Sequence, residues 1–381
     1  MIEARRLRVV VVMPPVVQSP PAEALAAMPT VTMTLDALAA SGVVDVAACF
    51  RTASVAAQID RNGIVHRFEP SDRALARAVR ELQPDVVHVH GLGFVTLLAR
   101  LSRALDRRVA IVVQHHGEPP GPWRNRLLHR LVRRRIDGYL FTGADDGQAE
   151  PFRAAGVVGP DARVFDVLEA ASTLPPDDPT DNAADVVSVR LDGHPAVLWV
   201  GRLIVGKDPL GAVDAIAAAA EHQPDVQLHL LTTDSTMKGA TLARAATLGI
   251  ADRVHLHPPV PRGQMHRWYR AADLLLSTSR REGSNYSLIE ALTYGCPPAV
   301  TDIAPHRSIT GDLAPRFACG DAAGAAAVIA HAAGMERATV EAYRDAHLTW
   351  PVVAGRLIGI YRVVAGLEGT ASPHVRGEPS A

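Results

Sequence analysis

Short apolar runs alternate with helical patterns along the first half of the chain. The runs are rich in Val and Ile and cover residues 8–13, 43–50, 85–90, 109–114 and 138–142. Continuous apolar runs of this length are typical of parallel strands that are buried on both faces. Residues 71–82 and 93–105, which lie between these runs, have helical patterns. The alternation predicts a doubly wound α/β domain.

The same alternation begins again near residue 196. Predicted strands cover 196–200, 226–232, 254–257, 274–278 and 298–301, and predicted helices cover 210–221, 238–248, 264–271 and 287–293. Between the two halves, residues 174–185 are polar, rich in proline and without periodicity, which favours a linker. We therefore expect two domains, 1–180 and 186–349, that face each other across a cleft. Open α/β sheets bind ligands at the carboxyl ends of their strands, so functional residues are expected in the loops there.

Both chain ends show patterns of their own. The apolar run 9–13 is stopped at once by Pro14 and Pro15, which makes it too short for a signal peptide or a membrane span. Residues 350–366 are amphipathic and predict a C-terminal helix that packs back on the first domain. Residues 367–381 are expected to be a disordered tail.

Composition and charge exclude several classes of protein. The 381 residues are 48% hydrophobic and 21% charged, as in ordinary globular proteins, and the net charge of −1 gives no overall attraction to nucleic acid. The cysteines Cys49, Cys296 and Cys319 have no metal-binding spacing. We expect reduced thiols, buried as small hydrophobic groups, in a cytoplasmic protein.

The strongest chemical signal is the segment 279–290, with the sequence S-R-R-E-G-S-N-Y-S-L-I-E, which follows a predicted strand and opens a helix. The amino end of that helix presents free N–H groups and a partial positive charge, which suit a phosphate. Glu282 lies just before this end, and Glu290 lies about one turn inside the helix. A carboxylate accepts two hydroxyl donors well, so the pair suits a sugar on one side of the phosphate and a ribose on the other.

The residues between the two glutamates support this interpretation. Gly283 lets the backbone approach a ligand closely, and Ser284, Asn285 and Ser287 can cap the helix. Taken singly, each glutamate is more simply explained as a loop charge or a solvated helix position. The complete segment in this position favours a ligand site.

A second segment, 198–209, has the sequence L-W-V-G-R-L-I-V-G-K-D-P and follows the first strand of the second half. Arg202 offers a planar fork of donors for phosphate oxygens, and Lys207 offers a mobile point charge. Together they can neutralise a diphosphate leaving group without a metal. The alternative is that both are surface charges in a strand-to-helix loop.

The E-x7-E spacing of Glu282 and Glu290, with V-G-R-x4-K at 200–207, resembles the retaining glycosyltransferases of family 4 (glycosyltransferase group 1). The A-L-T-Y-G-C-P run at 291–297, and Trp350 with Tyr361, are similar to later landmarks of that family. The resemblance is strong over 190–310 and diffuse in the first domain, where 85–91 and 112–117 fit best. It implies the GT-B fold, in which two Rossmann-like domains face a central cleft.

The resemblance also implies residue roles. Arg202 and Lys207 would hold the donor diphosphate, Glu282 the transferred hexose near its 3-hydroxyl, and Glu290 the ribose hydroxyls. The remaining donor-binding positions would be Gly283, Ser284, Asn285, Tyr286 and Ser287. The base would lie against residues 258–262 through backbone contacts, so its identity is weakly encoded.

In the first domain, V-Q-H-H-G at 113–117 ends a predicted strand, and His116 resembles the strand-end histidine that faces the donor sugar in this family. We assign a catalytic role to His116, together with Glu282, Arg202 and Lys207. His115 is the competing choice, and His90 with Gly91 at the preceding strand end is weaker. An isolated strand-end histidine is more often structural, so this assignment depends on its implied place opposite the donor.

One departure from the family pattern lies after the first strand. Family members usually have a glycine-rich loop there, whereas residues 14–21 of this chain read P-P-V-V-Q-S-P-P. Proline stiffens the backbone and removes N–H donors. The usual close backbone approach to donor and acceptor is therefore in question, and we expect an unusual acceptor pocket.

The implied reaction is transfer of a hexose, with retention, from a nucleotide diphosphate sugar to an acceptor hydroxyl. We expect a UDP-linked donor, which is a substrate, so no cofactor is needed. The sequence has no Asp-x-Asp metal motif, and no metal is expected. The acceptor is a small molecule, a glycan or a lipid-linked sugar. The alternatives are a nucleotide-sugar epimerase and a catalytically degenerate nucleotide-sugar-binding or partner subunit of the same fold.

The basic run 123–135 predicts a helix with Leu127, Leu128, Leu131 and Val132 on one face. Its arginines can favour an anionic membrane surface or a lipid-linked acceptor, so peripheral membrane association is one interpretation. The other is an ordinary domain helix with a solvated arginine face.

Overall fold

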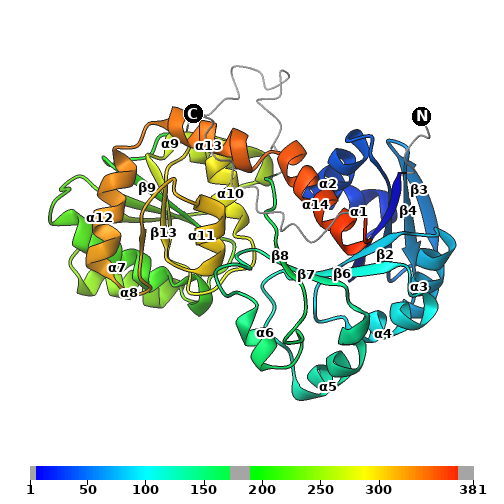
Figure 1. The fold of residues 1–381 in the computed structure, drawn as a ribbon. Coiled ribbons are helices and arrows are strands. Elements are labelled where there is room, and N and C mark those ends of the chain that lie inside the picture. Colours follow the sequence, from blue (N-terminus) through cyan, green and yellow to red (C-terminus); the bar gives the residue numbers. More distant parts are fainter. Residues whose placement is uncertain (1–5, 172–188, 368–381) are drawn as a thin grey trace, which may run out of the picture. The chain divides into compact units, whose positions relative to one another are not determined.

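The chain folds into two α/β units (Figure 1). The computed structural model describes residues 6–171 and 189–367. Unit 1 comprises Met1–Val167 and Trp350–Ala381, and unit 2 comprises Leu168–Thr349. The predicted linker at 174–185 and the predicted tail from 368 onward lie outside the described residues.

Unit 1 is built on an eight-stranded sheet. Its strands are β1 (Leu7–Val17), β2 (Val44–Thr52), β3 (Ala57–Arg61), β4 (Ile64–Glu69), β5 (Val86–His90), β6 (Ala110–Gln114), β7 (Gly138–Phe141) and β8 (Val164–Asp166). Their order is β3-β4-β2-β1-β5-β6-β7-β8, and only β3 and β4 pair antiparallel. The hairpin β3–β4 was not predicted, although Asn62 and Gly63 at its turn both have positive φ, which is the usual chemistry of a two-residue hairpin turn.

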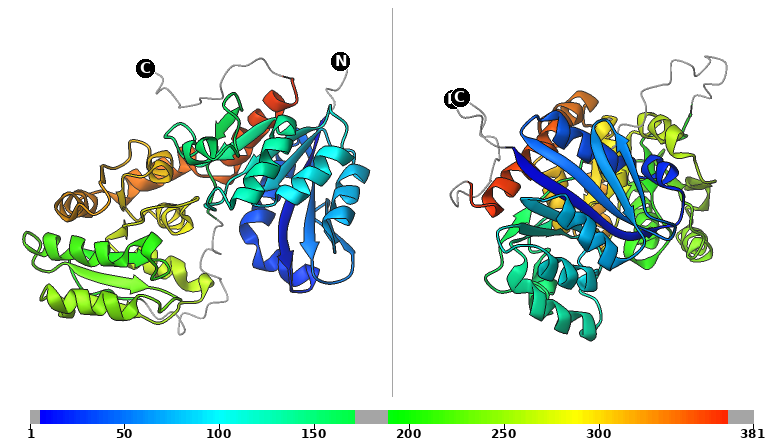
Figure 2. Two further views of the ribbon diagram at one scale, coloured as in Figure 1. Left: turned by 90° about the horizontal axis from the view of Figure 1, so that it is seen from below. Right: turned by 90° about the vertical axis from the view of Figure 1, so that its right-hand side faces the viewer.

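Helices cover both faces of this sheet. They are α1 (Pro21–Ala27), α2 (Pro29–Ala40), α3 (Asp72–Glu81), α4 (Val95–Ala104), α5 (Trp123–Val132), α6 (Glu150–Ala154) and α14 (Trp350–Val364). Strand residues such as Val87 share one core with α3 and α4. The neighbouring His88 points to the opposite face, because successive strand residues alternate. There its Nδ1 lies 2.8 Å from the Tyr361 hydroxyl of α14, which packs beside α2 (Figures 1 and 2).

The prediction that Pro14 and Pro15 end the first strand was wrong. Strand β1 continues to Val17, and its register against β2 shifts between Met13 and Val16. Proline cannot donate to a ladder, but a bulge leaves the extra residues unpaired and so tolerates it. The segment 14–17 is therefore an irregular strand end rather than a free loop.

Unit 2 is built on a six-stranded parallel sheet. Its strands are β9 (Ala196–Val200), β10 (Gln227–Leu231), β11 (Val254–His257), β12 (Leu274–Ser277), β13 (Pro298–Thr301) and β14 (Arg316–Phe317). Their order is β11-β10-β9-β12-β13-β14, which is the 3-2-1-4-5-6 order of dinucleotide-binding domains. The strand order reverses between β9 and β12, and this switch point is where such sheets bind ligands.

The helices of unit 2 bury both faces of the sheet. They are α7 (Pro209–Ala220), α8 (Lys238–Thr247), α9 (Met265–Ala271), α10 (Tyr286–Thr293), α11 (Ala304–Thr310), α12 (Ala322–Ala333) and α13 (Arg337–His347). Trp199 belongs to the core with α7 and α12, whereas its neighbour Leu198 belongs to the core with α9 and α10. This alternation confirms the predicted doubly wound architecture.

The cysteines differ from one another in burial. Cys49 and Cys296 are buried, as expected, and burial raises the pKa of each thiol to about 12. Cys319 is exposed, which contradicts the expectation for this residue. It lies just after the short strand β14, which forms an edge of the sheet.

Candidate functional site

The two predicted loops of unit 2 meet at the switch point of its sheet. Strand β9 pairs directly with β12, with Leu198 opposite Leu275. The loop after β9 carries Lys207 in the short 3-10 helix η2 (Val205–Lys207), and the loop after β12 carries Glu282. The topology therefore brings together two side chains that are 75 residues apart in the sequence.

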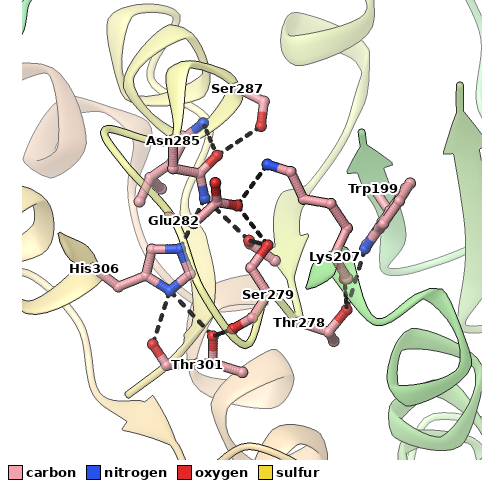
Figure 3. A network of polar contacts seen from close by, with 11 residues as sticks. Trp199, Lys207, Thr278, Ser279, Glu282, Asn285, Ser287, Thr301 and His306 are labelled. Carbon is pink, nitrogen blue, oxygen red and sulfur yellow. Dashed lines mark hydrogen bonds and ion pairs between the residues drawn. The ribbon is translucent and has the colours of Figure 1, made fainter. Parts of the chain in front are cut away.

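Lys207 and Glu282 form an ion pair (Figure 3). Lys207 Nζ lies 2.5 Å from Glu282 Oε1, and the Ser279 hydroxyl donates to the same oxygen at 2.5 Å. The Glu282 side chain is only 8% exposed and the Lys207 side chain 22% exposed. The residue predicted to bind the diphosphate, Lys207, and the residue predicted to bind the hexose, Glu282, thus contact each other.

Asn285 fixes the conformation of the backbone between Glu282 and helix α10. Its φ of 39° places it in the left-handed region, which asparagine tolerates better than most residues, and its Oδ1 accepts from Leu288 N as the N-cap of α10. The Ser287 hydroxyl donates to the same Oδ1 at 2.9 Å. Asn285 is thus the N-cap, one of the three capping residues that the sequence predicted, whereas Ser287 lies inside the helix and its hydroxyl donates to the capping side chain.

His306 lies in α11, the helix after the neighbouring strand β13, and anchors Asn285 (Figure 3). Burial lowers the pKa of His306 to about 4, although the nearby Glu282 carboxylate acts in the opposite direction. The ring is therefore neutral near pH 7. Its Nδ1 lies 2.8 Å from the Thr301 carbonyl oxygen and donates to it, so Nε2 accepts from Asn285 Nδ2 at 2.8 Å. His306 was not among the predicted site residues, although its position shortly after the strand 298–301 was a usable signal.

A second set of hydrogen bonds fixes the Lys207 loop. Asp208, with a φ of 49°, caps α7 through Gly211 N and accepts from Arg280 Nε at 2.7 Å. The Thr278 hydroxyl donates to the Asp208 carbonyl oxygen at 2.8 Å and accepts from the buried Trp199 indole at 3.2 Å. These contacts join the β9 and β12 loops at several points, so the position of the Lys207 stem is set by both.

Glu290 lies inside α10 and is only 9% exposed, so it is not a solvated helix position. The Tyr269 hydroxyl donates to Oε2 at 2.9 Å, and Arg262 Nη2 lies 3.3 Å from Oε1. Burial raises the pKa of Glu290, while the Tyr269 hydrogen bond and the Arg262 charge act against that rise. Arg262 belongs to the segment 258–262 that was predicted to face the base. Tyr269 had no recognisable sequence signal.

Tyr269→Phe is expected to destabilise the protein in a way that depends on pH. At pH values above the Glu290 pKa, a hydrogen bond to a charged group is lost, which lowers the free energy of unfolding by about 1.5–3 kcal/mol. Burial raises the pKa of Glu290 in the folded protein, so the fold favours the protonated carboxyl. This favourable contribution to the free energy of unfolding is present at low pH and is lost as the pH rises through the folded pKa. The loss of unfolding free energy caused by Tyr269→Phe should shrink as the pH falls, because Tyr269 then donates to a neutral carboxyl instead of a charged one.

Urea unfolding of Tyr269→Phe at a series of pH values tests this. Tyr343→Phe is the matched control, because the Tyr343 hydroxyl donates to a neutral acceptor, the Ile309 carbonyl oxygen, at 2.9 Å in the same unit. Tyr343→Phe should lower the free energy of unfolding by less, and this loss should not change with pH as Glu290 titrates. Equal deficits of both variants at every pH would show that the Tyr269–Glu290 contact has no charged character.

Arg202 is separate from the Lys207–Glu282 network. Its side chain is exposed, and its positive charge helps to lower the pKa of Asp234, after the larger effect of hydrogen bonds from Thr236. The structure therefore brings together Lys207, Glu282, Ser279 and Asn285, while Arg202 and Glu290 lie beside other partners. An exposed guanidinium without a strong protein partner remains available to a ligand.

A cavity of about 340 Å³ borders the same two loops on the side of Asp208, Thr278 and Arg280, near the starts of α7 and α12. Its charged lining residues are Asp208, Asp214, Arg244, Arg280 and Asp321. Arg280 is paired with Asp208 and Arg244 with Asp214, each at 2.7 Å, so neither guanidinium is uncompensated. Neither Lys207 nor either predicted glutamate lines this cavity. We therefore place the candidate site at the switch-point loops.

In unit 1, the structure separates the two candidate histidines. His115 is buried against Phe141 and Phe152, and burial lowers its pKa. His116 is exposed, and its Nε2 lies 2.8 Å from Nδ1 of His90 at the end of the adjacent strand β5. His116 is thus the ligand-accessible residue of the pair, and His115 is a core residue.

Glu118 holds the two strand ends of unit 1 together. Its carboxylate accepts from the backbone N–H of His116 at 2.8 Å and from the backbone N–H of Leu92 at 2.5 Å. Gly91 has a φ of +100°, and an added Cβ would lie 2.9 Å from the Phe94 ring. This close packing explains a glycine at that position without invoking a ligand.

The two units match two protein-family models. Residues 194–333 match the family described as "Glycosyl transferases group 1", and residues 4–149 match the family described as "Glycosyltransferase Family 4". These ranges cover the whole sheet of unit 2 and every strand of the unit 1 sheet except β8.

Two curated proteins are similar to this chain over most of its length. The GDP-mannose:cellobiosyl-diphosphopolyprenol alpha-mannosyltransferase of Xanthomonas campestris is 26% identical over 300 residues, which are 75% of this chain and 76% of that protein. A D-inositol 3-phosphate glycosyltransferase of Mycobacteroides abscessus is 30% identical over 270 residues, 68% of this chain and 59% of that protein. The match to the second thus spans less than two thirds of its length.

Two solved structures show the fold. A sucrose-phosphate synthase from Thermosynechococcus elongatus has a TM-score of 0.68 at 15% identity, over 95% of this chain and 100% of that chain. A UDP-forming trehalose-phosphate synthase from Burkholderia xenovorans has a TM-score of 0.65 at 13% identity, with the same coverage. Together with the two parallel-sheet units, these likenesses show the predicted GT-B fold.

Proposed function

Because the chain belongs to the family 4 glycosyltransferases, which transfer a sugar from a nucleotide-sugar donor, we propose that it moves a hexose from a UDP-linked donor to an acceptor hydroxyl with retention of configuration. The observation that carries this proposal is the Lys207–Glu282 ion pair at the sheet's switch point. A cation and a carboxylate meet there at the amino end of α10, so a phosphate and a sugar hydroxyl can bind side by side.

The diphosphate binds to Lys207, to Arg202 and to the first N–H groups of α10. On donor binding, Lys207 exchanges part of its contact with Glu282 for the phosphate oxygens. Arg202 is exposed and offers its guanidinium fork. The backbone of Gly283, Ser284 and Tyr286 completes this cradle. Cations and N–H groups that are already in place stabilise the negative charge that develops on the leaving diphosphate.

The two glutamates hold the two sugars of the donor. Glu282 accepts hydrogen bonds from the hexose near its 3-hydroxyl, since its position next to Lys207 is adjacent to the phosphate. Glu290 accepts hydrogen bonds from the ribose hydroxyls through the carboxylate lone pairs that Tyr269 and Arg262 do not use. Neither glutamate acts as nucleophile or base.

Retention follows from attack of the acceptor hydroxyl on the face from which the diphosphate leaves. A donor phosphate oxygen takes the acceptor's proton, so no protein nucleophile is required. The resemblance to the family also implies a role at the donor sugar for His116, whose position within unit 1 is fixed by His90 and, through its backbone N–H, by Glu118. The reaction is independent of metal, because Lys207 and Arg202 supply the positive charge and the sequence lacks an Asp-x-Asp motif.

A donor panel tests this function. At a concentration of 100 times Kd, a ligand that binds only the folded protein stabilises it by about 2.7 kcal/mol and raises the Tm of a unit this size by roughly 5–10 °C. UDP-hexoses should give this shift and be hydrolysed slowly, and the hydrolysis rate should not change on addition of EDTA. A rate that falls with EDTA and returns with a divalent cation would overturn metal independence.

GDP-mannose is the most important competitor in that panel, because the Xanthomonas campestris relative carries it in its name. If only GDP-mannose stabilises the protein and is hydrolysed, the proposal of a UDP-linked donor is wrong, whereas the proposal of hexose transfer is retained. Binding of a nucleoside diphosphate without turnover of any donor sugar would favour the catalytically degenerate alternative. Free nucleoside diphosphate released together with an epimerised sugar would favour the epimerase.

A further inference from the structure

Helix α5 exposes an unusual amount of apolar surface. Trp123 is 64% exposed, Leu127 49%, Leu128 38% and Leu131 77%, all within one helix of ten residues. Single exposed leucines are common on protein surfaces, whereas a contiguous group of large apolar side chains marks an interaction surface.

The helical period places these residues on the outer side of α5. Trp123, Leu127 and Leu131 follow one another at intervals of four residues and form one row. The opposite side of the helix is fixed to unit 1: Val132 is buried in the core, and His129 Nε2 contacts the Leu92 carbonyl oxygen at 2.8 Å. The helix therefore cannot roll to bury the exposed row without breaking these contacts.

Positive charge surrounds the apolar row. Arg124, Arg126, Arg130 and Arg134 are all exposed, and within the described ranges none of them forms an ion pair with a carboxylate. No Asp or Glu occurs between Glu118 and Asp137 in the sequence. On the helical wheel, Arg126 and Arg130 flank the row on one side and Arg124 on the other. The arginines thus keep their full positive charge next to exposed Trp and Leu side chains.

We propose that α5 docks on the surface of an anionic lipid bilayer. An amphipathic helix with Trp and Leu on one side and arginines at its borders lies in the interface plane, where the apolar row enters the acyl boundary and the guanidinium groups contact anionic headgroups. Trp123 is suited to the headgroup level because its ring is amphipathic. With ten residues, α5 is far shorter than the roughly 20 residues of a membrane-spanning helix, so it lies on the bilayer surface. Among the described residues, none of the helices could span a bilayer.

Charge favours a membrane over the other occupants of such a surface. A symmetric contact between two copies of α5 would bring the arginines of both chains together without any acidic partner on the helix. Nucleic acid would pair with the arginines but would leave the Trp–Leu row without an apolar partner. Only an anionic bilayer offers both negative headgroups and a hydrocarbon phase.

Docking has a consequence for unit 1. Residues 115–122 lead directly from β6 into α5, and they include His116 and Glu118. Leu92, which follows β5, contacts both Glu118 and His129. The carboxyl ends of β5 and β6 are therefore tied to the helix that contacts the bilayer. The docking itself does not depend on the proposed transfer reaction.

Vesicle binding tests this proposal with the full chain. The probes are vesicles of phosphatidylcholine alone and vesicles with 30% phosphatidylglycerol, and binding is measured by co-sedimentation. The protein should bind the anionic vesicles at least tenfold more tightly. Replacing Trp123, Leu127 and Leu131 together by Ser should reduce this binding more than tenfold, and Arg124→Gln should reduce it about fivefold, as expected for one charge near an anionic surface.

The control replaces Val43 and Val55, which are 43% and 83% exposed, by Ser. It should bind vesicles as the unchanged protein does. Thermal unfolding and slow donor hydrolysis should be unaffected in all variants, which separates docking from folding and from transfer. The proposal is overturned if anionic vesicles are not bound, if the triple variant binds them equally well, or if the triple change instead abolishes self-association or binding to an RNA probe.

Discussion

Glu282→Gln is expected to lower the rate of donor turnover on the order of 100-fold, the effect of removing one preorganised hydrogen-bonding group from a transition state. Glutamine has the same shape and can still accept from Ser279, whose hydroxyl lies 2.5 Å from Oε1. The negative charge next to Lys207 is lost, and with it the strong acceptor proposed for the hexose hydroxyl. Nucleoside diphosphate affinity should change little, because that part of the donor contacts other residues.

The measurement compares donor hydrolysis and nucleoside diphosphate binding in the same preparation. Glu221→Gln is the matched control: the same chemical change at an exposed position that ends α7 in the same unit. The control should turn over donor at the unchanged rate. Near-normal turnover by Glu282→Gln, with an unchanged Tm, would contradict the assignment of Glu282 to the hexose.

Lys207→Ala is expected to reduce donor turnover by roughly 100- to 1000-fold and to weaken nucleoside diphosphate binding as well, because the ammonium group stabilises the leaving diphosphate. It should also lower the free energy of unfolding by about 1–3 kcal/mol, since the nearly buried Glu282 carboxylate loses its charged partner. Lys207→Ala differs in this respect from Glu282→Gln, which affects turnover but leaves no unpaired negative charge.

The double variant separates these two effects. In Lys207→Ala combined with Glu282→Gln, no buried charge remains, so the stability losses should be less than additive, while turnover stays low. Lys238→Ala, at an exposed position at the start of α8, controls for loss of one positive charge in the same unit. Additive stability losses in the double variant would show that Lys207 and Glu282 do not interact in solution. An unchanged nucleoside diphosphate affinity of Lys207→Ala would show that Lys207 does not bind the phosphates.

Local signals in the sequence predicted much of the architecture. The apolar runs 196–200, 254–257 and 298–301 are strands with those limits, and α14 covers 350–364 as its amphipathic period indicated. Asn285 caps α10 as its position before the helix predicted. These features depend on residues that are neighbours in the chain, so the period and the side-chain chemistry are sufficient to recognise them.

Two local predictions failed for an identifiable reason. The Pro-Pro pair at 14–15 is a strand breaker by its own chemistry, yet pairing with β2 carries β1 past it through a register shift. Cys319 is a small hydrophobic group by composition, yet its place beyond the last short strand leaves it exposed. In both cases a neighbouring strand, or its absence, overrides the preference of the residue.

The glutamate pair shows the same division between sequence and tertiary structure. The sequence alone determined that Glu282 and Glu290 flank the start of a helix that follows a buried strand, because that statement concerns nine consecutive positions. Only the tertiary structure decided their partners: Lys207 for Glu282, and Tyr269 with Arg262 for Glu290. Strand order determines which loops meet, and strand order results from packing whole helices on both faces of a sheet. A pattern along one chain contains the parts of this site, and the order β11-β10-β9-β12-β13-β14 places them together.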